Sequence, residues 1–142
     1  MAEVLYASFV EYEPLYTRQG FPATTPTAEQ ILARMREGPA WVSVRQTEVV
    51  GTVAAVLKGQ SVYMRGMAVL PAARGLQVGT RLIECVEDWA LDLGYRRLLL
   101  STTPFLNRAI RLYERCGFRR TDNGPRDLFG TPLFTMEKTV LR

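Results

Sequence analysis

The chain contains no histidine, and its 142 residues include only two cysteines, Cys85 and Cys116. Without histidine, the Ser–His and Cys–His arrangements that activate a nucleophile in many enzymes are excluded. The two cysteines are far apart in the sequence, so we expect no metal site. Two isolated cysteines also do not make a disulfide framework, which favours a reducing, cytoplasmic location.

Long apolar runs are missing too, and the first residues lack the basic-then-apolar pattern of a secretion signal. No run approaches the roughly 20 residues that span a bilayer, so we expect no membrane partner. With 47% hydrophobic and 23% charged residues, the composition is that of an ordinary globular protein. We therefore assign residues 1–142 to a single domain.

The chain has a formal net charge of +4, but it has no basic run, because its arginines are spread over several segments. This distribution favours attraction to a small anionic molecule and does not predict a nucleic-acid partner.

The hydrophobic pattern predicts three strands in succession and then an alternation of helices and strands. Thr27 and Gln30 form a capping box at the start of one helix, and Cys85 falls in the predicted buried stripe of another. We expect an α/β (α+β) domain with a mixed sheet and helices on both faces. The expected strands are 41–46, 49–57, 62–70, 97–102, 118–121 and 133–138; the expected helices are a short one broken near Pro14, 28–37, 78–93 and 107–116; and the expected loops are 17–26 and 122–132.

The stretch from Arg74 to Gly79 lies between the apolar run 64–70 and the amphipathic segment 78–93. A strand that leads through a glycine-containing turn into a helix exposes the first amides of that helix at its positive end. Such a turn can seat a phosphate group, and Arg74 adds a positive charge. A plain connector remains the alternative, because the G-x-G-x-x-G and G-x-x-x-x-G-K-[ST] patterns are absent.

Four short motifs occur in an order and at separations that resemble the GNAT superfamily of acyl-CoA-dependent N-acetyltransferases, over residues 27–139. They are Met67-Ala68-Val69, Pro71-Ala72-Ala73-Arg74-Gly75 with Gly79, Asn107, and Leu112-Tyr113-Glu114-Arg115-Cys116-Gly117-Phe118. The resemblance implies a mostly antiparallel central sheet of six to seven strands with about four helices on both faces. It also implies two neighbouring parallel strands that splay apart, the one ending near Val69 and the one at 97–102.

The resemblance further implies that acetyl-CoA is the co-substrate and that it lies in the cleft between the splayed strands. Its pantetheine arm would pair with the main chain, and its pyrophosphate would meet the amides of the turn. For the Asn107 amide the alternatives are contact with the pantetheine or a helix N-cap, and both can hold. The implied binding residues are Met67, Ala68, Val69, Arg74, Gly75, Leu76, Gln77, Val78, Gly79, Thr80 and Asn107.

Tyr113 matches the family tyrosine that protonates the leaving coenzyme A sulfur, whereas its spacing alone fits an aromatic residue of a helix stripe. Transfer would be direct, from a ternary complex, to the amine of a small molecule or a peptide. Gln77 departs from the family pattern, which has glycine there; its β-carbon narrows the room for a phosphate and disfavours a positive φ. Cys116 matches no catalytic position, and we expect it in the core.

The acceptor side is the least patterned part of the chain, and no general base is identified. Glu11, Glu13, Asp122 and Asp127 are candidates, although a surface role is favoured for each. For Tyr63 and Arg65 we favour strand packing over a place in the cleft. Five aromatic residues near the start could form core, acceptor pocket or a homodimer surface, with core favoured: Tyr6, Phe9, Tyr12, Tyr16 and Phe21. A non-catalytic acyl-CoA-binding module remains the alternative function.

Overall fold

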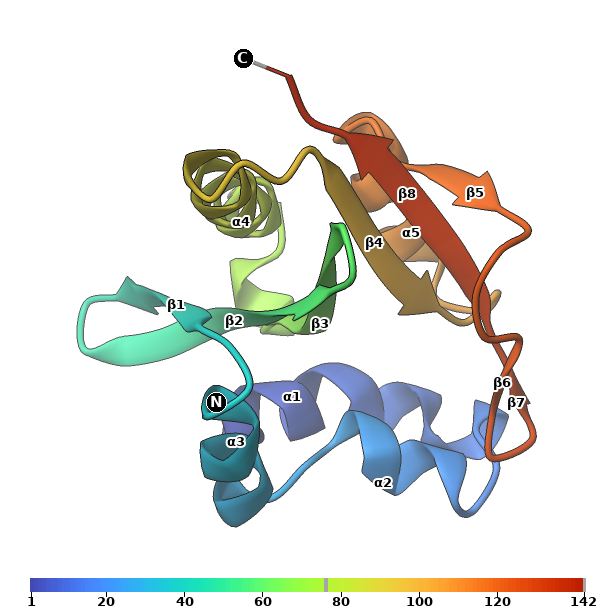
Figure 1. The fold of residues 1–142 in the computed structure, drawn as a ribbon. Helices are drawn as coiled ribbons and strands as arrows, with labels where there is room; N and C mark the ends of the chain where they lie inside the picture. Colours follow the sequence, from blue (N-terminus) through green and yellow to red (C-terminus); the bar gives the residue numbers. More distant parts are fainter. Residues whose placement is uncertain (76, 142) are drawn as a thin grey trace.

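The computed structural model describes residues 1–75 and 77–141, which form a six-stranded sheet with helices on both faces (Figure 1). The strand order is β1-β2-β3-β4-β8-β5, and β3 and β4 form the parallel pair in this otherwise antiparallel sheet. A separate hairpin consists of β6 and β7. The strands are β1 Ala40–Arg45, β2 Glu48–Lys58, β3 Ser61–Val69, β4 Arg97–Thr102, β5 Arg119–Thr121, β6 Asp127–Leu128, β7 Thr131–Pro132 and β8 Phe134–Thr139.

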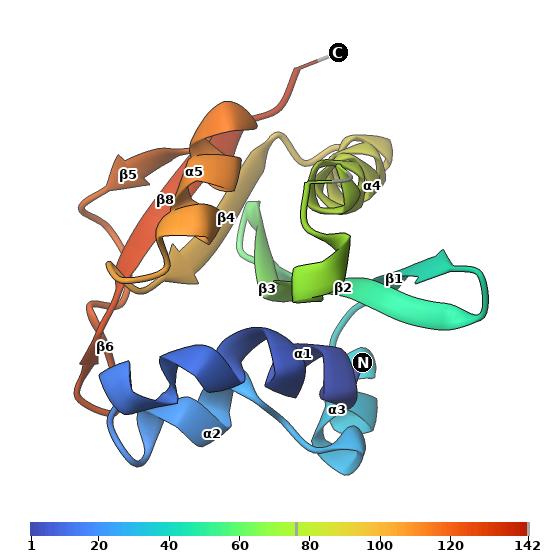
Figure 2. The same ribbon diagram turned by 180° about the vertical axis from the view of Figure 1, so that it is seen from behind.

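The helices divide between the two faces of the sheet. Helices α4 and α5 pack on one face over the main core, in which Val53, Met64, Val86 and Leu98 are almost fully buried. Helices α1 and α3 cover β2 and β3 on the other face, and α2 lies beside them (Figures 1 and 2). The helices are α1 Ala2–Phe9, η1 Val10–Leu15 (3-10), α2 Gly20–Thr24, α3 Ala28–Met35, η2 Pro71–Ala73 (3-10), α4 Val78–Asp92 and α5 Asn107–Arg115.

The predicted architecture is confirmed, and each predicted strand and helix is present with its ends shifted by at most two residues, apart from the first helix. That first helix does not stop at Pro14; it changes at Val10 into the 3-10 helix η1, which carries Pro14 inside it. The two predicted loops are more ordered than expected, because 17–26 contains α2 and 122–132 contains the β6–β7 hairpin.

Two smaller expectations are wrong. Cys85 is exposed, because the buried stripe of α4 runs through Leu82, Ile83, Val86 and Ala90 and so turns Cys85 outward. Asn107 is the first residue of α5, and Leu106 stands at the N-cap position without a side-chain cap. The Asn107 side chain therefore does not cap the helix.

The parallel pair β3–β4 separates halfway along its length. Its register runs from Val62 opposite Leu98 to Met64 opposite Leu100 and then stops, although β3 continues to Val69. The pairing of β3 with β2 shifts at the same level, opposite Val53, where Gly66 has a φ of +62°. A bulge of this kind bends a strand, and a positive φ is accessible to glycine at little cost. The bend turns the second half of β3 away from β4.

Candidate functional site

A cleft of about 1050 Å³ opens where β3 and β4 separate. Because the strands part, the cleft is lined from both faces of the sheet. Its lining from β3 and from the start of α4 includes Met67, Ala68, Val69, Arg74, Gly75, Gln77, Val78, Gly79 and Thr80. Tyr113 and Cys116 line it from α5, and Phe9, Tyr12, Tyr16 and Arg34 line it from the other face.

The main chain of Val69 faces the open side of β3. Leu70 N–H donates to the Val50 carbonyl at 2.8 Å, which directs residue 70 toward β2. Since the direction of hydrogen bonding alternates along an antiparallel pair, the N–H and C=O of Val69 point away from β2. The Val69 carbonyl accepts a hydrogen bond from the buried Ser8 hydroxyl at 3.0 Å. A carbonyl oxygen has two lone pairs, so one remains for a ligand.

The first turn of α4 opens onto the same cleft. The N–H groups of Val78, Gly79 and Thr80 lie in this turn, where a helix has no acceptor of its own for them, and among the described residues the N-cap side chain makes no capping hydrogen bond. A β-carbon on Gly79 would lie 2.6 Å from Leu112 Cδ2, so glycine allows α4 and α5 to approach closely here. The result is a set of donors without intrahelical acceptors at the positive end of a fifteen-residue helix.

Gln77 is the N-cap residue of α4 and has a left-handed backbone, with φ 62° and ψ 18°. This conformation costs free energy for a residue with a β-carbon, which is why the sequence predicted that Gln77 disfavours a positive φ. The backbone therefore adopts the conformation that a glycine would adopt, and the exposed Gln77 side chain does not prevent it.

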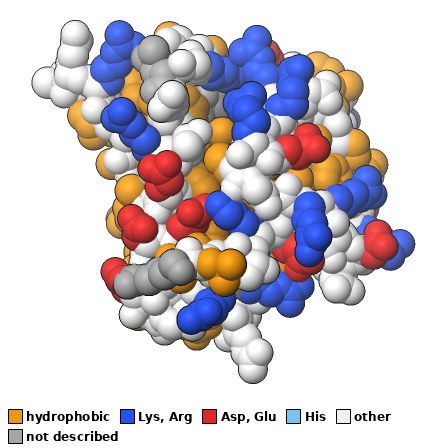
Figure 3. Space-filling view, turned by 90° about the horizontal axis from the view of Figure 1, so that it is seen from above, with side chains coloured by type: hydrophobic (Ala, Val, Ile, Leu, Met, Phe, Trp, Pro, Cys, Tyr) orange, Lys and Arg blue, Asp and Glu red, His pale blue; other side chains and the backbone are white. Residues whose placement is uncertain are grey.

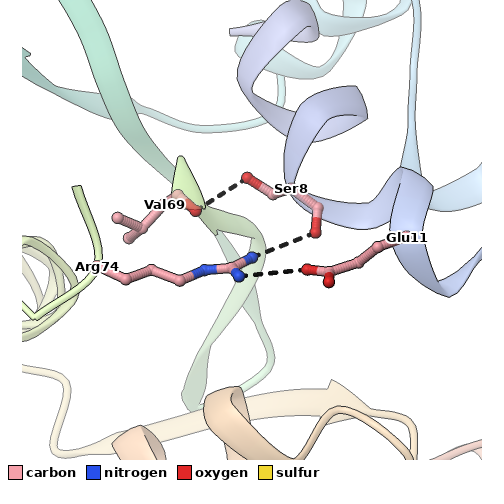
Figure 4. A network of polar contacts seen from close by, with 4 residues as sticks. All are labelled: Ser8, Glu11, Val69 and Arg74. Atoms are coloured by element: carbon pink, nitrogen blue, oxygen red, sulfur yellow. Dashed lines mark hydrogen bonds and ion pairs between the residues drawn. The ribbon is translucent and has the colours of Figure 1, made fainter. Parts of the chain in front are cut away.

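Arg74 lies between the turn and the start of the chain (Figure 4). Its Nη1 is 3.2 Å from Glu11 Oε1, and its Nη2 donates to the Ser8 carbonyl at 3.4 Å. Ser8 thus contacts both Arg74 and Val69, through its carbonyl and its hydroxyl. The Arg74 guanidinium, with five N–H donors, lines the cleft while it is held by α1 and η1.

Tyr113 is buried in the lining of the cleft, with its ring edge-on to Phe118. Burial raises the pKa of its hydroxyl far above the ordinary value of 10, and the nearby Tyr16, Cys116 and Tyr63 raise it further. Tyr16 follows η1 and Tyr63 lies on β3, so groups from outside α5 also act on the Tyr113 hydroxyl. Tyr113 is therefore protonated at neutral pH.

The β4 wall of the cleft holds polar groups that sequence reasoning missed. Ser101 Oγ and Thr102 Oγ1 are buried, line the cleft and have no hydrogen-bond partner among the described residues. Buried hydroxyls are normally hydrogen-bonded, so such groups indicate a place for a polar ligand. A run of Ser and Thr at the end of an apolar strand was the available signal.

The wall opposite α5 comes from the start of the chain and from the loops. Phe9, Tyr12 and Tyr16 line the cleft, whereas Tyr6 is 53% exposed and Phe21 is buried outside the lining. The expected core role holds for Tyr16, which is 8% exposed, and for Phe9, which packs against the smaller core cluster, although both also border the cavity. It is wrong for Tyr6. Tyr63 and Arg65 line the cleft as well, contrary to the favoured packing role.

The loop around α2 and the β6–β7 hairpin are joined into one wall. Thr17 N–H donates to Thr131 Oγ1 at 2.9 Å, and the Thr17 hydroxyl donates to the Phe129 carbonyl at 2.8 Å. Thr131 is 1% exposed, which makes this contact well shielded from water. Thr24 and Leu128 line the cleft from these two segments.

The remaining residues named from the sequence are Asn107, Leu76 and Cys116. Asn107 is exposed and is not part of the cleft lining. Leu76 lies outside the described residues. Cys116 packs at the edge of the core, and burial raises the pKa of its thiol, although a hydrogen bond with Thr80 opposes this. It is therefore a thiol and not a thiolate at neutral pH.

Acidic residues are scarce in the cleft. Among the described lining residues the only carboxylates are those of Glu84 and Glu87 on α4, and Glu87 pairs with Lys138 at 2.6 Å. The four candidate bases named from the sequence are exposed and do not line it. The described residues contain no group of three or more histidine, cysteine or acidic side chains able to hold a metal.

The outer surface seen from above mixes basic and acidic side chains and shows no single basic stripe on that face (Figure 3). None of the helices in the described part of the chain has the length and apolar character required to cross a membrane.

Comparison with known proteins places this geometry in a family. The model of the acetyltransferase (GNAT) family matches residues 3–118. The chain is 38% identical over 91 residues to an IAA acetyltransferase of Azospirillum brasilense, covering 63% of this chain and 58% of that protein. It is 31% identical over 128 residues to the uncharacterized N-acetyltransferase YjgM of Escherichia coli, covering 86% of this chain and 76% of that one. The PaiA N-acetyltransferase of Thermoplasma acidophilum, solved with coenzyme A, has the same fold, with a TM-score of 0.81 at 16% identity over 97% of this chain and 89% of that one.

Proposed function

The chain belongs to the acetyltransferase (GNAT) family, and we propose that it transfers the acetyl group of acetyl-CoA to the amine of a small molecule or a peptide. The observation that carries the proposal is the cleft between the parting strands β3 and β4, which is lined by the open edge of β3, by the start of α4 and by Tyr113.

The polar groups of the cleft fit acetyl-CoA. The open edge of β3 at Val69 offers an N–H and a C=O to an extended chain that carries amides, as pantetheine does. The free amides at the start of α4, with Arg74 beside them, suit a diphosphate. Met67, Ala68, Gly75, Gln77, Val78, Gly79 and Thr80 complete this half of the site in the proposal.

Tyr113 would supply the hydrogen that the leaving sulfur needs. Acetyl-CoA brings the activated thioester, and attack by an amine leaves a thiolate that must be stabilised. Burial holds the Tyr113 hydroxyl in its protonated form. Because the same burial disfavours the thiolate charge, the basicity of the sulfur rises together with the pKa of the phenol, and donation between them remains feasible. Direct transfer fits Cys116, whose raised thiol pKa makes it a poor nucleophile.

The acceptor must reach the cleft as the free amine or lose its proton to water. No carboxylate of the described lining lies on the α1–α3 face of the sheet, where the acceptor wall is built. Water can carry the proton to bulk solvent because the cleft is open.

The test is release of free thiol from acetyl-CoA with a panel of amines. We expect amine-dependent release in the native chain, and we expect Tyr113→Phe to lower kcat by about 10²-fold or more, as removal of a general acid does. Acetyl-CoA affinity, measured by calorimetry, should change little in this variant. Tight acetyl-CoA binding with no amine-dependent release would instead support a non-catalytic binding module.

A further inference from the structure

Two arginines line the cleft on the α1–α3 face, Arg34 from α3 and Arg65 from β3. They use few of their donors: Arg34 Nη2 donates to the Ala23 carbonyl at 3.4 Å, and Arg65 Nη2 is 3.0 Å from Glu37 Oε2. Arg65 Nε is buried and has no hydrogen-bond partner in the part of the chain that the structure describes. Since each guanidinium carries five N–H donors, this end of the cleft has more donors than acceptors.

The positive charge of this pair is only weakly balanced. Desolvation and the neighbouring Arg65 lower the pKa of Arg34, while Glu37 acts in the opposite direction. The Glu37 side chain is 54% exposed and does not line the cleft, so water screens it. The acidic lining residues of the described chain are on α4, behind the sheet. An anion that enters this end of the cleft would therefore meet two cations, and its one competitor among the described groups would be the exposed Glu37 carboxylate that pairs with Arg65.

We propose that Arg34 and Arg65 form a subsite for a carboxylate on the acceptor, which makes the acceptor a small amino acid and not a simple amine. The inference rests on the proposed function, whose acceptor class it specifies. Arg65 and Tyr63 lie two residues apart on one face of β3, about 7 Å along the strand, and Tyr63 lies near the Tyr113 hydroxyl. If several bonds separate the amine and the carboxylate of an acceptor, its carboxylate can lie at Arg65 when its amine reaches Tyr113.

The experiment compares acceptors that differ in one group. The probes are 4-aminobutyrate, its neutral amide 4-aminobutyramide and the dication 1,4-diaminobutane, with the same comparison for the homologues one carbon shorter and longer. Values of kcat/KM are calculated on the concentration of free amine, which removes the effect of different amine pKa values. We expect the carboxylate to exceed the amide by about tenfold or more, as a charge-assisted hydrogen bond provides, and the dication to be the poorest.

Variants assign this preference to the two arginines. Arg34→Gln and Arg65→Gln should each reduce the carboxylate-to-amide ratio toward one. Glu37→Gln removes the competing carboxylate and should raise the ratio. Arg36→Gln is the matched control, because Arg36 is exposed at the end of the same helix and does not line the cleft. Urea unfolding of every variant reports whether the fold is intact, and acetyl-CoA affinity is measured on the variants that are folded.

The outcomes separate the inference from the proposed function. Amine acetylation without a carboxylate preference, or a preference that survives both arginine variants, overturns the subsite and leaves the acetyltransferase standing. A large loss of acetyl-CoA affinity in Arg34→Gln and Arg65→Gln assigns the arginines to acetyl-CoA and also overturns the subsite. If no amine releases thiol, the proposed function fails. The subsite is then judged by calorimetric titration of the three carboxylates onto the chain saturated with coenzyme A: binding that requires the arginines supports it, and absence of binding overturns it.

Discussion

The ion pair between Arg74 and Glu11 should oppose acetyl-CoA binding while it stabilises the fold. Arg74 lines the cleft beside the α4 amides, where we place the diphosphate, yet its guanidinium is engaged by Glu11 and by the Ser8 carbonyl (Figure 4). A diphosphate and a carboxylate would compete for the same donors. Glu11→Gln should therefore tighten acetyl-CoA binding and lower the free energy of unfolding, which are changes of opposite sign in one variant.

The size of both effects follows from exposure. The Glu11 side chain is 51% exposed and that of Arg74 is 23% exposed, so the pair belongs to the class worth about 0.2–1 kcal/mol. Loss of the pair should destabilise the fold by that amount and lower the Kd for acetyl-CoA by about 1.5- to 5-fold. Arg74→Gln removes the charge-assisted contacts to phosphate themselves and should raise the Kd by about 10- to 100-fold.

Calorimetric titration and urea unfolding of four chains test the reasoning: the native chain, Glu11→Gln, Arg74→Gln and the double variant. In the Arg74→Gln background, Glu11→Gln should leave the Kd almost unchanged, because the guanidinium that it competes for is gone. Glu13→Gln is the control, since Glu13 is exposed on the same 3-10 helix and does not line the cleft. Weaker binding in Glu11→Gln, or a Kd that does not respond to Arg74→Gln, would refute the assignment of Arg74.

Three further predictions concern the turn and Tyr113. Gln77→Gly should raise the free energy of unfolding by up to about 1 kcal/mol, because glycine relieves the cost of the left-handed backbone, and it should tighten acetyl-CoA binding. Gln46→Gly is the control: Gln46 lies at the β1–β2 turn with φ 59°, so this variant should raise the free energy of unfolding without changing acetyl-CoA binding. Gly79→Ala should cost about 1–3 kcal/mol in urea unfolding, because its β-carbon would press on Leu112, and should weaken acetyl-CoA binding as the α4 amides shift. The pKa of Tyr113 in the folded chain lies above its unfolded value near 10. The contribution of Tyr113 to the free energy of unfolding is therefore complete below pH 10 and is lost above it, by up to about 1.4 kcal/mol per pH unit. Urea unfolding between pH 9 and 11.5 should show this loss in the native chain relative to Tyr113→Phe; equal slopes in the two chains would contradict it.

The α4 side of the molecule was predictable because local chemistry determines it. Glycine and proline mark the turn at residues 71–79, and the apolar spacing after it allows a helix but not a strand. An error arose where helical spacing allows two neighbouring residues as the buried one. Cys85 has the size and polarity of a buried residue, but it lies outside the buried stripe of α4. Gln77 shows the reverse case: tertiary structure imposes a backbone conformation that the residue type disfavours.

The α1–α3 side was less predictable because contacts between distant segments build it. Ser8 reaches Val69 across 61 positions, and Thr17 reaches Thr131 across 114. Alternation along β3 indicated that Tyr63 and Arg65 share a face, but no local pattern indicates whether a helix or a cavity covers that face.

The two halves of the cleft differ in what recognises the ligand, and this difference explains both the family likeness and the limit of sequence reasoning. On the α4 side the groups that meet the proposed acetyl-CoA are mostly amides and carbonyls, such as those of Val69 and Val78, which any side chain can provide if the backbone is placed correctly. On the α1–α3 side the recognition groups that we propose are side chains, above all those of Arg34 and Arg65, which line the cleft. A family can therefore keep the first half while its acceptor changes with a few substitutions in the second. Exchange of these two arginines should alter acceptor choice before it alters acetyl-CoA affinity.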